Sequence, residues 1–406
     1  MSDCWRPSLW WQLLGVLAAT ANAFAGWEFT PAGDPDRNWS ANVTLRGLYD
    51  DNFNATEANR QSGLRFQSNL RLLAKVPVER LLLGARYDYG VEYPRDVNLG
   101  EFNETHNFLG TLNYTFNPRL TLNVNENFIQ SLQPQLVQSQ AGTPVTVVQA
   151  GTYIYDSVSG TLTYLLGPRW RASIAGSWDI IRYQDRAVAQ FSDHEDYQTT
   201  LSIVRALNPR TALGLSYRYE RNLFTNPGTN DVLNGQANSG YITFVRKFNP
   251  RMSLELDGGY TLREGDDGTQ TTAPFVYSSL IYQYGPESTL SASAGHSLSA
   301  ASVGITRDFS ASENTTLALQ INHRVTIRLR ALADFAYTFS TFESALPGRS
   351  STTAEEQAIT GHLGVNYAFR VWLSVVADYY YTKLFSDLAG RAYERNQIGV
   401  GVTLSY

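Results

Sequence analysis

The sequence has 406 residues, a formal net charge of −5 at pH 7 and one cysteine. Mild acidity gives no basic surface of the kind that nucleic-acid binding needs. Charged residues make up only 17% of the chain and aromatic residues 13%, whereas soluble domains carry about a quarter charged residues. The composition therefore predicts a protein whose surface is not built only for water.

Residues 1–25 have the pattern of a secretory signal peptide. Arg6 precedes an apolar run, and small residues at 21–25 offer a cleavage site. An uncleaved anchor is the alternative, although the run is short for a membrane span. Cys4 would leave with the signal, which excludes disulfides, cysteine-ligated metals and cysteine nucleophiles from the mature chain. We expect residues 26–38 to form a short periplasmic lead and residues 39–406 to form one transmembrane domain.

A short turn motif returns along this domain. It reads Asn117-Pro118-Arg119, Asn208-Pro209-Arg210 and Asn249-Pro250-Arg251, with related versions at Gly167-Pro168-Arg169 and Gly285-Pro286-Glu287. Asn at the first position bonds to nearby backbone, and Pro at the second position already has the φ of a type I turn. A recurring period indicates one repeated supersecondary unit. The unit here is a hairpin of two strands.

The chain after residue 38 shows alternation of apolar and polar residues with period two, which is typical of strands. No run of 18 apolar residues follows residue 25, so helical spans are not expected. We predict eighteen strands, with sixteen as the alternative count. They are placed at 39–53, 60–75, 80–94, 100–116, 119–131, 150–166, 169–183, 193–207, 210–223, 235–248, 251–264, 270–284, 287–300, 312–323, 325–342, 353–369, 370–386 and 391–406.

The alternation separates an apolar face from a polar face. A soluble β-sandwich also alternates, but these strands are longer than the usual five or six residues and suit a tilted bilayer crossing. Short turns at one end and longer loops at the other are typical of bacterial barrels. The fold class predicted is therefore all-β, a transmembrane antiparallel up-and-down β-barrel with short periplasmic turns and longer extracellular loops. Closure pairs every backbone amide in lipid, and a ring of this size encloses water.

Aromatic residues collect at both ends of the apolar faces and predict two interfacial girdles. The closing strand alternates and ends on an aromatic residue, which resembles the C-terminal signal read by the barrel assembly machinery. The girdle residues are Phe116, Tyr164, Phe248, Tyr284 and Phe369 beside the short turns, and Tyr89, Tyr219, Tyr260 and Tyr337 towards the loops. The assembly signal comprises Val402, Leu404 and Tyr406.

The polar face is the candidate chemical site because it would line the lumen. Acids and bases are nearly balanced there, so strong ion selectivity is not expected, and hydroxyls, amides and aromatic faces suit neutral polar solutes. The alternative is that these residues only keep the wall wet. Arg328 and Arg330 near Asp334 form the sharpest candidate for a solute contact. The lumen-lining candidates are Arg86, Asp88, Glu255, Asp257, Arg328, Arg330, Asp334, Trp372, Asp378 and Tyr380.

Two features leave alternatives open. The loop from about 131 to 151 carries no charged residue, and it either folds inward as an uncharged constriction or lies exposed outside. Glu126 falls in phase with apolar residues, which would point a carboxylate towards lipid. A bulge, an error in the assigned register or a subunit contact over that face would each account for it.

Enzymatic function is not expected. Some outer-membrane barrels are lipid hydrolases with Ser, His and an acid on the outer wall. Here His296 and Ser297 are adjacent in sequence, so alternation puts them on opposite faces. No metalloprotease, nucleophile-elbow, P-loop or dinucleotide motif is present. We therefore expect no catalytic residues, no metal site and no cofactor.

A family likeness is carried by Tyr49-Asp50-Asp51-Asn52-Phe53, the Asn-Pro-Arg turns and the closing aromatic strand. With these features nearly the whole mature chain resembles the putative β-barrel porin 2 family of Gram-negative outer membranes. The resemblance implies a passive channel, and members encoded with exopolysaccharide export systems imply passage of a saccharide. A non-conducting barrel that binds surface polysaccharide is the alternative, and a lipid hydrolase is third. The expected partners are outer-membrane lipid, lipopolysaccharide and the assembly machinery, with no nucleic acid; the oligomeric state stays open.

Overall fold

A computed structural model describes residues 38–94, 102–131, 136–138, 145–147, 152–225, 234–300, 309–344 and 353–406. The expected signal peptide, and all but the last residue of the expected lead, lie outside this part of the chain. No helix in the described ranges is both long and apolar enough to cross a membrane.

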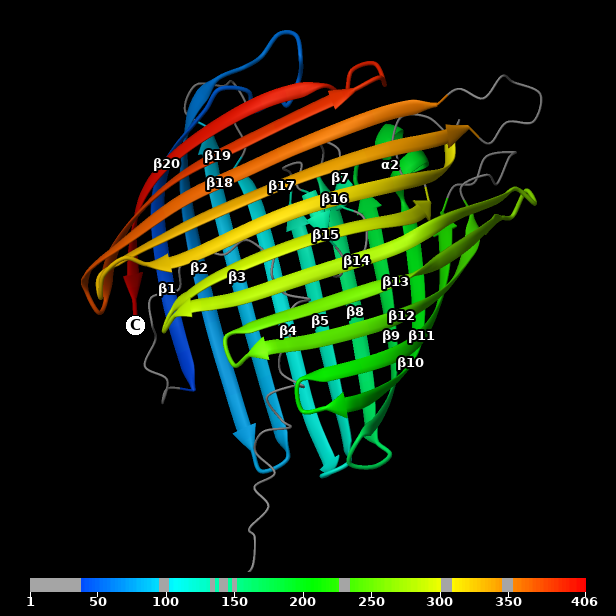
Figure 1. Ribbon diagram of the computed structural model, residues 1–406. Coiled ribbons are helices and arrows are strands. Elements are labelled where there is room, and N and C mark those ends of the chain that lie inside the picture. Colours follow the sequence, from blue (N-terminus) through cyan, green and yellow to red (C-terminus); the bar gives the residue numbers. More distant parts are fainter. Residues whose placement is uncertain are drawn as a thin grey trace, which may run out of the picture.

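Eighteen antiparallel strands form one sheet that closes on itself, because β1 pairs with β20 (Figure 1). Two further short strands, β6 and β7, pair only with each other. The predicted eighteen-stranded barrel is confirmed. The strands are β1 (Trp39–Asp50), β2 (Gly63–Val78), β3 (Leu81–Pro94), β4 (Asn103–Asn117), β5 (Leu120–Ser131), β6 (Leu136–Gln138), β7 (Val145–Val147), β8 (Tyr153–Leu165), β9 (Trp170–Tyr183), β10 (His194–Asn208), β11 (Thr211–Phe224), β12 (Gly235–Asn249), β13 (Met252–Gly265), β14 (Gln270–Gly285), β15 (Ser288–Ala300), β16 (Phe309–Arg324), β17 (Leu329–Ser344), β18 (Ala354–Arg370), β19 (Leu373–Ser386) and β20 (Tyr393–Ser405). A short helix, α2 (Arg186–Ser192), lies between β9 and β10.

The Asn-Pro-Arg turns form as the sequence predicts. In each, the Asn Oδ1 accepts a hydrogen bond from the backbone N–H of the Arg two residues on, at 2.9 Å for Asn117, 2.9 Å for Asn208 and 2.8 Å for Asn249. This bond holds the chain in a tight reversal, and the next strand begins directly after the Arg. Eight short turns lie at one end of the barrel, and the connections at the other end are longer except for the four residues between β13 and β14 (Figure 1). We call these the short-turn end and the loop end.

The outer face of the ring is apolar. On β20, Ile398, Val400, Val402 and Leu404 alternate with polar or small residues and are 42 to 57% exposed. Their partners across the β1 seam are apolar too, for example Val43 opposite Leu404. Exposed apolar side chains along whole strands suit contact with lipid rather than water.

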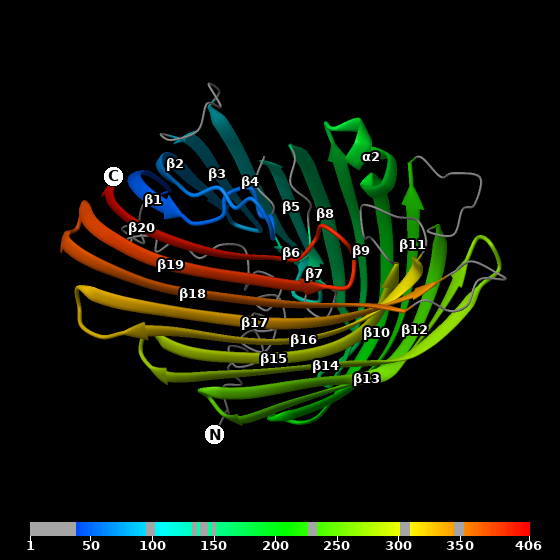
Figure 2. The same cartoon turned by 90° about the horizontal axis from the view of Figure 1, so that it is seen from above.

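Buried apolar clusters are small and sit towards the loop end. One joins Tyr153 and Tyr155 of β8 to Ile181 and Tyr183 of β9, and α2 packs against it through Val188. Seen from above, the strands surround an interior space (Figure 2). The polar faces of the strands line this interior, which is therefore where a site must be sought.

Candidate functional site

The inner face of the barrel is polar, and its composition follows from the alternation of each strand. On β13, Leu256, Tyr260 and Leu262 are exposed outside, whereas Thr261 is 2% and Arg263 is 3% exposed. Successive side chains of a strand point to opposite faces. Every residue in register with Thr261 and Arg263 therefore belongs to the inner wall, which includes Glu255 and Asp257, the two acids predicted on this strand.

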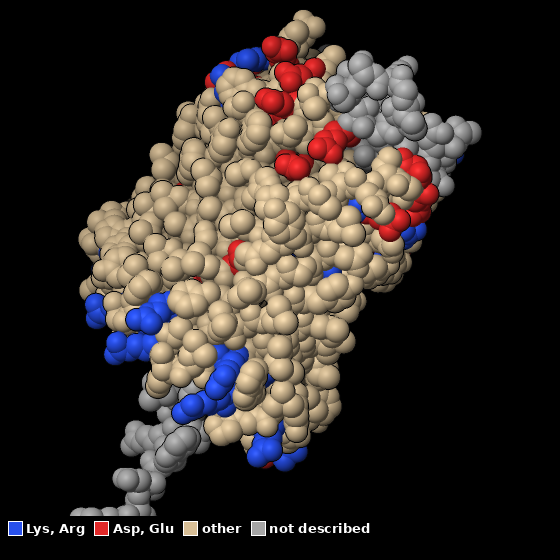
Figure 3. Space-filling view, turned by 45° about the vertical axis from the view of Figure 1, so that its right-hand side comes forward, with Lys and Arg blue, Asp and Glu red and all other residues tan. Residues whose placement is uncertain are grey.

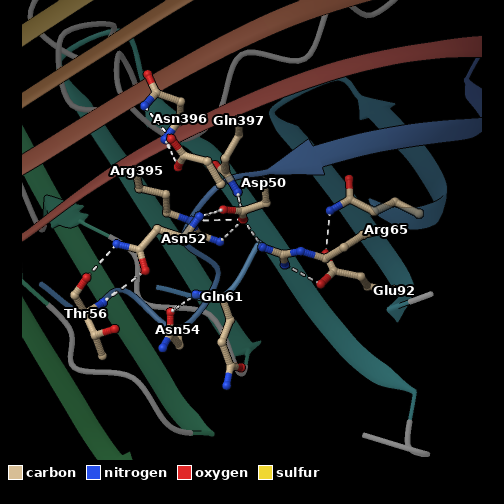
Figure 4. A network of polar contacts seen from close by, with 12 residues as sticks. Asp50, Asn52, Asn54, Thr56, Gln61, Arg65, Glu92, Arg395, Asn396 and Gln397 are labelled. Atoms are coloured by element: carbon tan, nitrogen blue, oxygen red, sulfur yellow. Dashed lines mark hydrogen bonds and ion pairs between the residues drawn. The ribbon is translucent and has the colours of Figure 1, made fainter. Parts of the chain in front are cut away.

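The tightest polar cluster lies where β1 meets β20, at the loop end (Figure 4). Asp50 is completely buried and pairs with Arg65 of β2 and with Arg395 of β20, whose Nη2 lies 2.6 Å from Oδ2. Gln397 donates to the same carboxylate at 2.8 Å, and Arg65 also reaches Glu92 of β3 at 2.5 Å. Two guanidiniums face two carboxylates. The cluster is thus neutral, and each buried charge has a partner.

The segment after Asp50 fastens the first loop to the last strand. Asn52 is also completely buried, and its Nδ2 donates to the carbonyl of Glu394 at 2.8 Å and to that of Thr56 at 2.7 Å. Asp51 accepts the backbone N–H of Asn396 at 2.6 Å. The residues that carry the family resemblance therefore bridge the first and last strands at the point where the ring closes.

A second line of charges crosses the wall further from the loops. Arg46 of β1 bonds to Asp378 of β19 at 2.7 Å, and His362 of β18 lies 3.1 Å from both Asp378 and Asp334 of β17. The ring of Tyr380 stacks on His362, with centroids 4.1 Å apart and planes 2° from parallel. Four strands thus share one chain of polar contacts that ends in an aromatic face.

Arg46 reaches Asp378 only by passing over β20, and Gly399 makes the passage possible. A Cβ at position 399 would overlap the guanidinium of Arg46. Gly399 is paired with Asp378 on one side and with Leu48 on the other. Because glycine has no side chain, it leaves room for the Arg46 side chain to cross β20 and pair with Asp378.

Neighbouring strands carry further pairs. Asp88 accepts from Arg71 of β2 at 2.5 Å and lies 2.9 Å from Arg86 of its own strand. Arg218 and Glu220 of β11 are 2.9 Å apart. Most charges of the inner wall are therefore compensated within the wall.

The strands predicted to carry Arg328 and Trp372 on the inner wall, 325–342 and 370–386, were given starts that are too early. The strands begin later than predicted, at Leu329 and Leu373, so both residues lie in short turns and are exposed, Trp372 by 56%. Arg330 bonds to Glu287 of a neighbouring turn at 2.7 Å, while Asp334 bonds to His362. Two members of the predicted contact site, Arg330 and Asp334, therefore bond to different partners.

Several residues of the wall were not among the lumen-lining candidates predicted from the sequence. Asp50 and Arg395 belong to the buried cluster at the seam, and His362 belongs to the line of charges around Asp378. Arg391 bonds to Glu356 of β18 at 2.5 Å near the loop end. Alternation alone would have put Asp50 and Arg395 on the inner face. Their pairing needs the closure of the ring, because they are 345 positions apart in sequence.

The uncharged loop between β5 and β8 contributes the hairpin of β6 and β7. The two strands pair in register, Leu136 opposite Val147. Figure 2 shows this hairpin within the ring of strands. The remainder of the loop predicted at 131–151 lies largely outside the described residues.

The predicted girdle residues fall on the outer register of their strands. Phe116, Tyr164, Phe248 and Phe369 are exposed beside short turns, and Tyr260 is 67% exposed towards the loops. The half-buried members make outward contacts: Tyr89 with Glu104, Tyr219 with Gln236, Tyr337 with Gln357 and Tyr284 with His323.

The predicted assembly signal lies at the seam. Val402 and Leu404 are on the outer face, and the ring of Tyr406 lies 5.1 Å from that of Trp39. The backbone of Tyr406 exchanges hydrogen bonds with Ala41. Recognition of this strand by the assembly machinery stays a prediction.

Glu126 is exposed on the outer face of β5. It pairs in unbroken register with Gly110 of β4 and Val158 of β8. A bulge and an error of register are therefore excluded as explanations for its position.

A protein-family model described as "Putative beta-barrel porin 2" matches residues 39–406. No curated protein matches the chain. Solved structures with similarity include Pseudomonas aeruginosa OccK2 (OpdF) in complex with glucuronate, at 12% identity over 91% of this chain and 98% of that one, with a TM-score of 0.46. The P. aeruginosa outer membrane protein opdK matches at 11% identity, 91% and 99% coverage and a TM-score of 0.44. The P. aeruginosa siderophore receptor PirA matches at 11% identity over 92% of this chain and 81% of that one, with a TM-score of 0.42.

Proposed function

Because the chain belongs to the putative β-barrel porin 2 family, we propose that it forms a channel through the outer membrane which polar solutes cross by passive diffusion. The observation that carries the proposal is the contrast between the two faces of one closed sheet. The outer face presents apolar side chains, and the inner face presents charged, amide and hydroxyl groups. A ring of eighteen strands leaves an aqueous lumen rather than a packed core.

The chemistry of the wall supports weak, nonspecific passage. Its ion pairs, such as Arg46 with Asp378 and Arg218 with Glu220, neutralise one another. A wall whose charges are paired stays hydrated but binds a passing solute only weakly. Weak binding is what conduction requires. The neutral amide and hydroxyl groups can exchange hydrogen bonds with saccharide hydroxyls, so we extend the proposal to saccharides, including segments of an exopolysaccharide.

The hairpin of β6 and β7 supports a narrowed pore. Its position within the ring (Figure 2) puts an uncharged backbone segment in the path of a solute. We propose that this hairpin is the constriction, so that solute size rather than solute charge is tested at that level.

The adjacent His296 and Ser297 do not form the histidine–serine pair that a lipid hydrolase of this kind would need. The Nδ1 of His296 bonds to Thr315 at 2.9 Å, and Thr315 and His296 are register partners on one face of the sheet. Ser297 is buried and points to the opposite face.

Planar-bilayer recording with a panel of neutral and charged sugars tests the proposal. We expect a persistent open-channel current that added sugar reduces in a size-dependent way. Folded protein, verified by its altered gel mobility before and after heating, that gives a silent membrane would contradict the channel. Sugar binding by such silent protein would support the non-conducting adhesive barrel instead.

A further inference from the structure

The short turns share a feature that the channel proposal does not use. The first residue after the reversal is an arginine in six of the eight turns. Glu287 and Trp372 occupy the equivalent place in the other two. We call the six the turn arginines: Arg80, Arg119, Arg169, Arg210, Arg251 and Arg328.

Backbone hydrogen bonds fix where these residues point. The carbonyl of each turn arginine accepts a bond from the neighbouring hairpin, for example from Leu165 to Arg119 and from Lys247 to Arg210, at 2.8 and 2.7 Å. Each therefore already belongs to the sheet ladder and follows its alternation. Arg119 lies two residues before Thr121, and Arg251 two residues before Ser253, so each arginine shares the inward-facing side of its strand with that residue. All six continue the inner face to the rim.

The turn arginines differ from the arginines of the wall in forming no ion pair, although Glu79 stands beside Arg80 in the first short turn. All six side chains are exposed, and no ion pair to any of them occurs among the described residues. Wall arginines such as Arg46 and Arg71 have carboxylate partners. The acid that interrupts the series, Glu287, is itself shared by Arg324 and Arg330. The short-turn rim consequently carries uncompensated positive charge.

Charge is separated along the barrel axis. On the face shown in Figure 3, the charged residues of the lower end are almost all Lys and Arg, whereas the upper end carries most of the Asp and Glu together with a few Lys and Arg, and a largely uncharged band lies between them. The lower, basic end is the short-turn end. A ring of one sign at the mouth of a low-dielectric channel focuses its field into the opening and concentrates counter-ions there.

We propose that the turn arginines make the short-turn mouth a capture site for anionic solutes, with carboxylate-bearing saccharides as the class that fits. Guanidinium groups bind carboxylates in a bidentate geometry, and several around one opening can hold successive carboxylates of one oligomer. The inference rests on the proposed channel and adds to it a preferred charge and a preferred side of entry.

Reversal potentials in a KCl gradient across a planar bilayer test the proposal. We expect the protein to prefer chloride to potassium, and the triple variant Arg119→Gln, Arg210→Gln, Arg251→Gln to lose about two- to tenfold of that preference. The matched triple Lys variant keeps the charge and should keep the preference. The effect should fade near 1 M salt, where the Debye length is about 3 Å. Arg221→Gln, which removes a loop-end arginine bonded to Asp266, should change nothing.

Sidedness gives a second readout. An oligogalacturonate should block the current more strongly from the short-turn side than from the loop side, and more strongly than a neutral oligosaccharide of equal length. A channel that conducts without preferring chloride, or that the charged oligomer blocks equally from both sides, would overturn the capture site while leaving the channel intact. Absence of any current would instead defeat the channel proposal. If the Gln variant conducts normally but associates less with phosphatidylglycerol vesicles, the arginines serve lipid phosphates and the inference is wrong.

Discussion

At the scale of single residues, the wall depends on a few side chains that each satisfy several others. Asp50 accepts from Arg65, Arg395 and Gln397 while being fully buried. Gly399 matters because it has no side chain, and the guanidinium of Arg46 occupies the space that a side chain would fill. Both positions are therefore sensitive to changes that would be minor elsewhere on a strand.

We expect Asp50→Asn to lower the free energy of unfolding by about 3–5 kcal/mol, because it leaves two buried guanidiniums without their shared carboxylate. Urea unfolding in lipid vesicles, followed by tryptophan fluorescence, measures the change. The control is Asp266→Asn, which breaks a pair with Arg221 whose side chains are 30 and 33% exposed and should cost only about 0–1 kcal/mol. Equal losses for the two variants would contradict the role given to Asp50.

Gly399→Ala should also destabilise the barrel, by about 1–3 kcal/mol, since a methyl group would displace Arg46 and leave Asp378 without it. The matched control is Gly258→Ala, because a Cβ there meets nothing within 4 Å. The same unfolding assay compares them. A Gly399 variant as stable as the Gly258 variant would show that Arg46 finds another path to Asp378.

At the scale of elements, periodicity predicted much of the structure because strands and tight turns are local. The Asn-Pro-Arg turns are an example, since the Asn accepts its bond from a residue two positions away. The misplaced starts of β17 and β19 show the limit. Val325, Ile327 and Val371 have high strand propensity, so the turns that contain them resemble strand in sequence. The pairing of Asp50 with Arg395 depends on ring closure between distant segments, which alternation does not encode.

The hairpin of β6 and β7 gives a prediction at this scale. Deleting residues 135–147 should raise single-channel conductance, because the segment lies within the ring and occupies part of the cross-section (Figure 2). A deletion of residues 346–351, in the loop between β17 and β18, serves as the control for shortening a loop. Unchanged conductance after the first deletion, in protein that folds and inserts, would show that the hairpin does not narrow the pore.

At the scale of the whole molecule, the barrel separates three environments. Charges inside are mostly paired, charges at the rims are exposed to water, and the outer band is apolar. Glu126 departs from this arrangement, because it is exposed on the outer face among Val124, Phe128 and Val158. A carboxylate facing hydrocarbon lowers the stability of a barrel, although less than a lysine or arginine does.

Glu126→Leu should therefore stabilise the inserted protein, by about 1–2 kcal/mol, if this face meets lipid. The measurement is urea unfolding in vesicles at several protein-to-lipid ratios, with Glu104→Leu as the control, since Glu104 lies nearer the loops and accepts a bond from Tyr89. A loss of stability that is greatest at high protein-to-lipid ratio and disappears as the protein is diluted in the bilayer would contradict this expectation. Dilution weakens only contacts between copies, so that result would mean that a second barrel covers Glu126. Stabilisation that is independent of dilution would instead mean that the carboxylate faces lipid in the monomer.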